Sequence, residues 1–251
     1  MALPFAGKHC AIVGATGIIG SSIAKAFASQ GAVLSLLGRT ALQVQPQLQR
    51  ELRPPQQGQD GTPSAHQFIS LDVSNTQSIK DAFSAQTSGV GPVDILVNCA
   101  GISQTTLLKR TPDEELSGII NTNLLATMLV CKHAKIRAQG CIINVSSLMA
   151  TKGGSGATAY AASKAGVIGF TRALCREMSP RSIRVNALLP GWVDSPMWNQ
   201  LKPDLKQKYL DDTPLRRVAD PAEVADAAVF LAANGFANNC VLNLDGGLSA
   251  A

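Results

Sequence analysis

The sequence predicts an α/β fold in which parallel strands alternate with helices. Short apolar runs that suit buried strands are followed by segments of helical character, beginning with Lys8–Val13 and Ser21–Gln30. A glycine-rich turn, Gly14–Gly20, joins this first strand to its helix. Ser147 follows a later apolar run. The carboxyl ends of parallel strands form the ligand crevice of open α/β sheets, so this residue is a candidate for the site.

Length and composition set the frame for this prediction. The chain has 251 residues and 45% hydrophobic content, enough for a full core, and one domain spanning 1–251 accounts for it. Its apolar runs are shorter than the roughly 20 residues that a membrane-spanning helix needs. No secretory segment precedes Phe5. We therefore expect a soluble, intracellular protein of the cytoplasm or the mitochondrial matrix.

Charge, cysteine and histidine content exclude several classes of function. The net charge is +5, without the lysine or arginine block typical of nucleic-acid binders. It fits either plain solubility or attraction to an anionic cofactor or partner. Six cysteines lack a Cys-x-x-Cys pair and lie in apolar contexts, which indicates reduced core thiols. Three isolated histidines predict no metal site.

The first two strand ends predict a dinucleotide site. Glycines at the first turn let the main chain approach a pyrophosphate at the helix N-terminus. The second strand, Val33–Leu37, runs into Gly38 and Arg39 without the acid that usually binds a ribose diol in NAD sites. Arg39 is placed to pair with a 2′-phosphate, which favours NADP(H), although a solvated loop arginine is the alternative.

The next elements are a helix, a polar loop and a third strand. The helix is predicted over 40–52, and the loop over 53–65, rich in proline and glycine, is predicted to be a mobile surface segment. The third strand, His66–Leu71, ends at Asp72. That acid either reaches an adenine amino group or, like Ser74, caps the helix predicted over 79–87.

Small residues follow the fourth strand, Val93–Val97. The sequence Asn-Cys-Ala-Gly over 98–101 lets a flat ring lie close to the backbone. A helical region then continues to about Ala138. It contains Asn123, an amide that is mildly unfavourable inside a helix. Asn123 is therefore expected either to fix a bend or to hold a water beside Lys164.

Ser147 follows the fifth strand, Cys141–Val145, and a glycine-rich loop over 151–158 is predicted to cover the site. The next helix carries Tyr160 and Lys164, which share one face because they are four residues apart. The Lys164 ammonium is expected to lower the pKa of Tyr160, giving a proton donor and acceptor near neutral pH. A chance Tyr-x-x-x-Lys pattern is the alternative, but the chain has only two tyrosines.

The remaining chain completes the alternation. A sixth strand is predicted over 183–189, a helix over 221–233 and a last strand over 241–244. The polar segment 192–214 follows a strand end, where substrate lids occur. Together with Ser103–Lys109 and Met149–Ala157, it is expected to determine substrate specificity.

These motifs together resemble the short-chain dehydrogenase/reductase family from end to end. The resemblance implies a single-domain, doubly wound Rossmann fold, with a seven-stranded parallel sheet and helices on both faces, usually in a homotetramer. It implies a catalytic set of Asn123, Ser147, Tyr160 and Lys164, with Lys164 also holding the nicotinamide ribose. The cofactor contacts that it implies are Gly14, Thr16, Gly17, Ile18, Ile19, Gly20, Arg39, Asp72, Val73, Asn98, Ala100, Gly101, Tyr160, Lys164, Pro190, Gly191, Val193 and Ser195.

Four segments narrow the resemblance: Asn121–Leu125, Gly166–Phe170, Ile183–Asn186 and Val241–Gly247. They are similar to 3-oxoacyl-[acyl-carrier-protein] reductases, especially the mitochondrial carbonyl-reductase type. This implies NADPH-dependent reduction of 3-oxoacyl-[acyl-carrier-protein] to the 3-hydroxyacyl form in fatty acid biosynthesis. The alternatives are a carbonyl, quinone, steroid or polyketide reductase of the same family, or a non-catalytic cofactor-binding subunit.

An acyl carrier protein is acidic, so the resemblance also implies a basic docking patch. Arg137 is expected at the end of the helix before the Ser147 strand, and Arg181 at the end of the Tyr160 helix. The two are predicted to form that patch beside the cleft. For Lys135 and Arg176, favourable charge at a helix C-terminus is the slightly better interpretation.

The glycine turn departs from the family pattern. Val13 stands where a threonine is usual, and Ile18 replaces the middle glycine, with Gly17 one step early. A side-chain phosphate contact at residue 17 is therefore lost, and Ile18 must be accommodated beside the cofactor.

Overall fold

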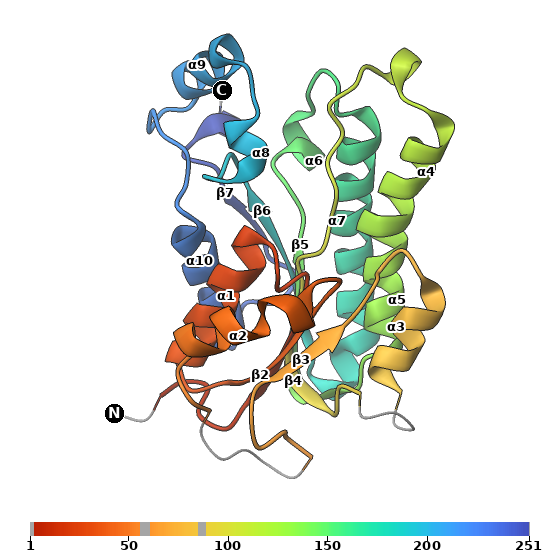
Figure 1. Cartoon of the computed structure of the whole chain (residues 1–251), viewed down its shortest axis with the longest axis vertical. Helices are drawn as coiled ribbons and strands as arrows, with labels where there is room; N and C mark the ends of the chain where they lie inside the picture. The colour runs from red at the N-terminus through yellow and green to blue at the C-terminus, as the bar shows by residue number, and fades with distance from the viewer. Residues whose placement is uncertain (1–2, 56–60, 85–88, 251) are drawn as a thin grey trace.

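A computed structural model describes residues 3–55, 61–84 and 89–250. Its seven strands form one parallel sheet in the order β3-β2-β1-β4-β5-β6-β7 (Figure 1). The strands are β1 (His9–Val13), β2 (Val33–Gly38), β3 (Gln67–Ser70), β4 (Val93–Asn98), β5 (Ile136–Val145), β6 (Arg184–Pro190) and β7 (Val241–Leu244). The order reverses between β1 and β4, which confirms the predicted doubly wound α/β fold and places a ligand crevice at that reversal.

Helices cover both faces of the sheet. Figure 1 shows α1, α2 and α10 on one face and α3, α4, α5 and α7 on the other. The helices are α1 (Ile18–Ser29), α2 (Ala41–Glu51), α3 (Thr76–Phe83), α4 (Asp113–Ile120), α5 (Ala126–His133), α6 (Met149–Lys152), α7 (Thr158–Met178), α8 (Pro196–Asn199), α9 (Pro203–Asp212) and α10 (Pro221–Ala233). A π-helical turn, Asn121–Leu125, joins α4 to α5.

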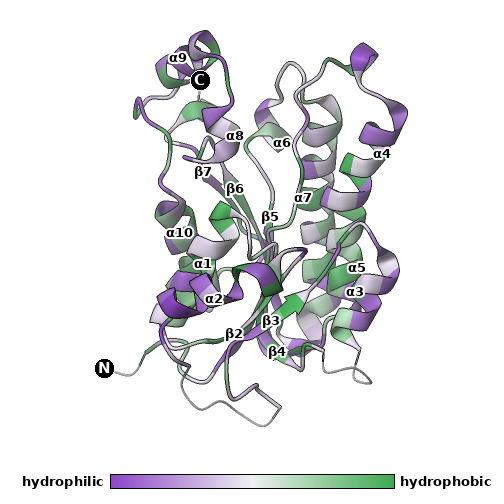
Figure 2. Cartoon of the chain, viewed as in Figure 1, coloured by the Kyte–Doolittle hydropathy of each residue, from purple (hydrophilic) through white to green (hydrophobic). Residues whose placement is uncertain are grey.

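Two hydrophobic layers hold the helices to the sheet. Phe27 and Ile23 of α1 are fully buried on one side, and Ile79 of α3 is fully buried on the other. In Figure 2, α1, α5, α7 and α10 carry hydrophobic bands, whereas α2 and much of α9 are hydrophilic. Each buried side chain of this size contributes about 1.5–3 kcal/mol. The central strands are therefore fixed in place, and with them the loops at their ends.

The largest difference from the predicted elements lies before β5. The helix expected to reach Ala138 ends at His133, because Ala134 already has an extended backbone. β5 begins at Ile136, five residues earlier than expected. Its pairing with β4 is interrupted between Ile136 and Cys141, where Gln139 adopts a positive φ of 62°.

Two smaller differences concern α3 and α6. Helix α3 begins at Thr76 because Asn75 caps it, accepting from Gln77 N at 2.8 Å and Ser78 N at 3.2 Å. The predicted loop over 151–158 instead begins inside α6. Residues 56–60 of the predicted mobile loop and residues 85–87 of the predicted third helix lie outside the described residues. Among the described helices, none is both long and apolar enough to span a membrane.

Candidate active site

The structure brings Ser147, Tyr160 and Lys164 together at the carboxyl edge of the sheet. Ser147 follows β5 by two residues, and the other two lie on α7. The Ser147 hydroxyl lies close enough to the Tyr160 phenol to lower its pKa. Lys164 Nζ lies 5.9 Å from the centre of the Tyr160 ring and donates to Val145 O at 2.9 Å. A hydroxyl, a phenol and an ammonium therefore share one site.

The pKa of Tyr160 differs from the expectation. Burial raises it above the usual value, and the neighbouring Ser147 hydroxyl opposes that shift only in part. The net shift is therefore upward, and the sequence-based expectation of a lowered pKa is wrong. Removing the phenol from water disfavours its charged form more strongly than its neighbours favour it. Tyr160 is accordingly a neutral phenol, the form that can give a proton.

Lys164 is almost completely enclosed. Only 4% of it is exposed, and burial lowers its pKa from 10.5 to about 8. Ser146 fixes the same turn of α7, since its hydroxyl donates to Lys164 O at 2.7 Å. The ammonium is thus held in a low-dielectric site and keeps its charge near neutral pH.

Asn123 lies in the π-helical turn and is fully buried. Its Oδ1 accepts from Ile102 N at 2.8 Å, and its Nδ2 donates to Ile102 O at 2.9 Å and Ser163 Oγ at 3.0 Å. Thr127 Oγ1 also donates to Asn123 O, at 2.9 Å. The predicted bend is therefore a π turn, and it directs Asn123 toward the chain that follows β4.

The glycine turn has the shape of a phosphate cradle. Gly14 has a φ of +86°, and a Cβ there would lie 2.5 Å from Ala100 N. A Cβ on Gly20 would lie 2.1 Å from Gly14 O, so both positions require glycine. Gly17 is the N-cap of α1 and has no side chain to cap it, and the first turn carries no acid. The first amides of α1 thus face an anion site. Ile18 is 41% exposed, and Ile19 packs against the core.

Arg39 and Asp72 lie near one another beyond the ends of β2 and β3. Asp72 accepts from Ser74 Oγ at 2.7 Å and Ser74 N at 3.0 Å. These bonds, and to a lesser extent the Arg39 charge, lower the pKa of Asp72. Asn75 caps α3, so neither Asp72 nor Ser74 has the capping role left open by the sequence. Arg39 itself is exposed.

The other predicted cofactor residues lie at the same edge of the sheet but differ in whether their side chains already have partners within the protein. Asn98 donates to Asn144 Oδ1 at 2.9 Å and Cys131 Sγ at 3.3 Å, and its Oδ1 has no hydrogen-bond partner among the described residues. Ser195 caps α8 by accepting from Trp198 N at 3.3 Å. The amide nitrogen of Asn98 and the hydroxyl of Ser195 are therefore already engaged within the protein. The remaining predicted cofactor residues lie around this site. Thr16 lies next to Gly38, Val73 packs beside the core, and Gly101 follows β4. Pro190 ends β6, the amide of Gly191 donates to Leu244 O, and Val193 forms a β-bridge with Ala219.

The segment predicted as a substrate lid contains α8 and α9. Its aromatic rings pack together: the Trp192 and Tyr209 ring centres are 4.5 Å apart, and those of Trp192 and Trp198 are 5.5 Å apart. Three of the four tryptophan and tyrosine residues in the chain thus form one cluster. This cluster anchors the segment beside β6 and β7.

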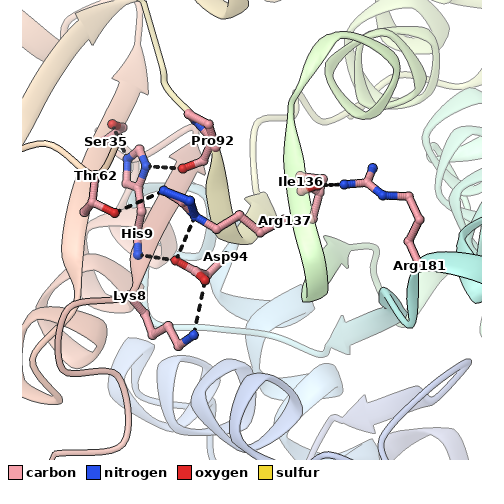
Figure 3. A network of polar contacts seen from close by, with 9 residues as sticks. All are labelled: Lys8, His9, Ser35, Thr62, Pro92, Asp94, Ile136, Arg137 and Arg181. Atoms are coloured by element: carbon pink, nitrogen blue, oxygen red, sulfur yellow. Dashed lines mark hydrogen bonds and ion pairs between the residues drawn. The ribbon is translucent and has the colours of Figure 1, made fainter. Parts of the chain in front are cut away.

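Arg137 and Arg181 lie at one end of the sheet, but not beside the cleft as predicted. Arg137 lies at the start of β5, the opposite edge of the sheet from Ser147. Its Nε is 3.7 Å from Asp94 Oδ2, its Nη2 donates to Thr62 Oγ1 at 3.2 Å, and its side chain is 18% exposed (Figure 3). Arg181 donates to Ile136 O at the same edge. The predicted docking patch beside the cleft is wrong, because the helix ends before Arg137 and the strand takes it to the far edge.

Two polar residues at the site were missed by sequence reasoning. Ser163 lies between Asn123 and the Tyr160 carbonyl, to which it donates at 2.7 Å. Its position three residues after Tyr160 was an available signal. Gln104 accepts from the backbone amide of Tyr160, and no local sequence pattern indicates that contact. Across residues 3–55, 61–84 and 89–250, no group of three His, Cys, Asp or Glu side chains is placed to hold a metal ion.

Comparison with known proteins finds relatives that match nearly the whole chain. A family model described as enoyl-(acyl carrier protein) reductase matches residues 14–249. The chain is 38% identical over 248 residues to the 3-oxoacyl-[acyl-carrier-protein] reductase FabG of Chlamydia trachomatis, covering 96% of this chain and 97% of that protein.

Animal relatives are similar over the same extent. The 3-oxoacyl-[acyl-carrier-protein] reductase of Mus musculus is 35% identical over 244 residues, and carbonyl reductase family member 4 of Xenopus tropicalis is 36% identical over 245 residues. Each comparison covers 96% of this chain and 98% of the relative. A solved structure from Agrobacterium tumefaciens, described as a gluconate dehydrogenase, shares the fold with a TM-score of 0.85 and 24% identity, over 100% of both chains.

Proposed function

The chain belongs to the short-chain dehydrogenase/reductase family, and on that basis we propose that it reduces a ketone to a secondary alcohol with NADPH. The observation that carries this proposal is the convergence of Ser147, Tyr160 and Lys164 at the carboxyl edge of the sheet. A non-catalytic cofactor-binding role would give no reason to keep these three groups together.

Each side chain has a role in the proposed reaction. Ser147 and Tyr160 hold the ketone oxygen through their hydroxyl groups, which are already neighbours. Tyr160 gives its proton to that oxygen as negative charge develops there. Lys164 stabilises the resulting phenolate, because its ammonium lies beside the ring. The bound cofactor supplies the hydride that the carbonyl carbon receives.

The residues present fit a dinucleotide. The cradle formed by Gly14, Gly17 and Gly20 leaves the amides of α1 open to a pyrophosphate. Thr16, Ile18 and Ile19 line the same turn. Lys164 is placed to hold the nicotinamide ribose. Asp72, Val73, Ala100, Gly101 and the 190–195 segment complete the proposed binding surface.

Selectivity for NADPH is proposed from the end of β2. Residue 38 is a glycine, so no carboxylate there can accept hydrogen bonds from a free ribose diol. Arg39 is exposed beside Asp72 and presents a guanidinium suited to a phosphate. The 2′-phosphate of NADPH would therefore lie near the Arg39 cation, with no acid at residue 38 to repel it.

The names of the relatives support a 3-oxoacyl group on acyl carrier protein as the substrate, and a place in fatty acid biosynthesis. The second candidate is a free carbonyl compound, such as a quinone or a polyketide, and the Xenopus tropicalis relative named as a carbonyl reductase favours it. An acyl chain or a ring would bind beneath the lid over 192–214. The cytoplasm or the mitochondrial matrix is the proposed location.

We also propose that the chain forms a single domain and that four copies assemble into a homotetramer. Ala162, Ala165 and Gly169 lie exposed along one face of α7. A Cβ on Gly169 would meet no atom within 4 Å, which leaves room for another helix to approach. Gly166, in contrast, is needed within the subunit, because a Cβ there would lie 2.7 Å from Leu124 Cδ2. Light scattering at micromolar concentration tests this, and a single monomeric species contradicts it.

The function is tested by following NADPH oxidation with purified protein. Acetoacetyl thioesters, 3-oxoacyl groups on acyl carrier protein, quinones and cyclic ketones are compared by kcat/KM. We expect the carrier-linked substrate to give the highest value. A higher value for a quinone or cyclic ketone supports the second candidate, and no turnover with any of them contradicts the reductase proposal.

A further inference from the structure

Helix α7 carries Tyr160 and Lys164 but begins without a cap of its own. Its N-cap is Ala157, whose methyl group cannot accept a hydrogen bond. The first amides of a helix have no partner within the helix, and a polar N-cap side chain usually satisfies them. Here the amides of Ala159 and Tyr160 are among those that need an acceptor.

Gln104 supplies that acceptor from a distant part of the chain. Its Oε1 accepts from Ala159 N at 2.8 Å and from Tyr160 N at 3.3 Å. The Gln104 side chain comes from the segment after β4, and the residue is only 4% exposed. It therefore acts as a remote cap, and one of the two amides that it binds belongs to Tyr160 itself.

The other end of the Gln104 amide is also engaged. Nε2 donates to Thr106 O at 3.0 Å, Thr111 Oγ1 at 3.1 Å and Thr158 Oγ1 at 3.4 Å. The oxygen meets donors and the nitrogen meets acceptors, so the network permits one orientation of the amide. Because a buried amide that loses a partner pays the cost of desolvation, these bonds hold the side chain in place.

The same segment is held at a second point. Ile102 exchanges two hydrogen bonds with the Asn123 side chain, of 2.8 and 2.9 Å. Residues 102–104 thus connect the side chain of Asn123 to the backbone amide of Tyr160. A change at Gln104 reaches the phenol through the first turn of α7.

We propose that Gln104 is a positioning residue, which fixes the main chain at Tyr160 and so directs the Tyr160 hydroxyl toward Ser147. This inference rests on the proposed role of Tyr160 as proton donor. Small displacements matter for such a group, since a misplacement of about 1 Å can cost about 100-fold in rate. Substituting Gln104 should therefore lower the reaction rate, whereas substituting an ordinary buried glutamine would lower only stability.

The first test compares three variants by kinetics and thermal unfolding. Gln104→Met keeps the size of the side chain and loses its acceptor, Gln104→Glu keeps the acceptor, and Thr111→Val removes a hydroxyl of the same network that does not touch α7. We expect Gln104→Met to lower kcat about tenfold or more, with KM and the NADPH dissociation constant changed less than about threefold. Gln104→Glu should recover most of kcat, and Thr111→Val should retain it.

The second test needs no turnover. The chain has two tyrosines, so in a Tyr209→Phe background the absorbance of phenolate near 295 nm reports on Tyr160 alone. Burial raises the pKa of Tyr160. Loosening the first turn of α7 in Gln104→Met should therefore shift that pKa by about half a unit or more, downward where water reaches the phenol and upward where the contact with Ser147 is lost. Thr111→Val should leave it unchanged, and Gln104→Glu should stay close to the wild type.

The outcomes separate this inference from the proposed function. Equal loss of kcat and of unfolding midpoint in Gln104→Met and Thr111→Val, with Tyr160 titrating unchanged, overturns the inference. If Gln104→Met does not fold, the test depends on Gln104→Glu, which retains the acceptor. A tenfold loss of kcat together with a shifted Tyr160 pKa in that variant would also overturn the inference. If the wild type reduces no ketone but the titration shift is seen, the proposed function fails while the placement of Tyr160 by Gln104 stands.

Discussion

Lys164 Nζ and Asn123 Oδ1 face the same space, where Gly101 lacks a side chain. A Cβ on Gly101 would lie 3.3 Å from the Lys164 nitrogen and 3.2 Å from the Asn123 oxygen. A donor and an acceptor therefore border one small gap beside the proposed proton donor. A side chain at residue 101 would displace one or both of these groups.

Filling this gap should reduce turnover. In Gly101→Ala, the added methyl group would sit closer to Lys164 and Asn123 than ordinary contact allows. We expect kcat to fall about tenfold while the protein still folds. The control is Gly118→Ala on α4, where a Cβ meets no atom within 4 Å. That change should leave kcat unaltered and stabilise the helix by about 0.4–1 kcal/mol. Equal kcat values in the two variants would exclude a role for the gap.

Removing the Tyr160 hydroxyl should abolish most of the reaction without removing the cofactor site. Tyr160→Phe retains the ring beside Lys164 but has no proton to give. We expect turnover to fall about 100-fold or more, since general acid catalysis typically contributes at least that much. The NADPH dissociation constant, measured by fluorescence titration, should change little. A variant that keeps more than about a tenth of wild-type turnover would show that Tyr160 is not the acid.

Cofactor preference should change when the residues at the end of β2 are substituted. Gly38→Asp with Arg39→Leu supplies an acid for the ribose diol and removes the guanidinium. We expect the ratio of kcat/KM values for NADPH and NADH to move toward NADH.

The structure calls for a steric control in that experiment. A Cβ on Gly38 would lie 3.0 Å from Thr16 Oγ1 and 3.1 Å from Thr16 Cγ2. Gly38→Ala alone therefore measures the cost of moving Thr16, which should affect both cofactors equally. A wild-type enzyme that already prefers NADH would contradict the assignment of Arg39.

Burial of Lys164 should make stability depend on pH. Its pKa is about 8 in the folded protein against the ordinary lysine value of 10.5. Below pH 8 the folded protein bears the full cost of a buried charge, and above pH 10.5 it bears none. Stability relative to Lys164→Met should therefore rise with pH between these values, by about 2 kcal/mol from pH 7 to pH 9.5. Urea unfolding of both proteins measures this difference, and a constant difference would exclude the lowered pKa.

Reversing Arg137 should damage the fold rather than the recognition of a carrier. Arg137→Glu would set a carboxylate against Asp94, which is 7% exposed, in place of an ion pair of 3.7 Å. We expect a loss of about 1–3 kcal/mol in unfolding free energy, between the values for exposed and buried pairs. Any loss of activity should be equal for carrier-linked and free ketones. A rise in KM for the carrier-linked substrate alone would contradict this structural role.

The sequence was sufficient to predict the architecture because the hydrophobic runs of the central strands and the cap of α10 are clear in it. β1, β2 and β4 are completely buried, so their apolar runs are continuous. Helix α10 has Pro221 at its first position and Asp220 as its cap, and its bounds were predicted without error. The spacing of Tyr160 and Lys164 placed both on one face of α7 because helix geometry does so directly.

What the sequence could not give depends on contacts between distant residues. The end of α5 has neither glycine nor proline, so nothing local marked the turn at Ala134 that carries Arg137 away from the site. The pKa of Tyr160 depends on how fully the folded chain excludes water, which a four-residue spacing does not encode. Gln104 contacts a residue 56 positions later in the chain.

The π-helical turn at Asn121–Leu125 has a consequence for the number of residues between α4 and α5. A π turn contains one residue more than an α turn, and each residue of an α-helix rotates the chain by about 100°. Deleting one residue between Asn121 and Leu125 would let the helix close regularly and would turn Asn123 away from Ile102. Replacing a residue there would leave the count unchanged. In this stretch the active site is therefore specified by chain length as well as by side chains, and a gap placed here in a sequence alignment marks a change of geometry.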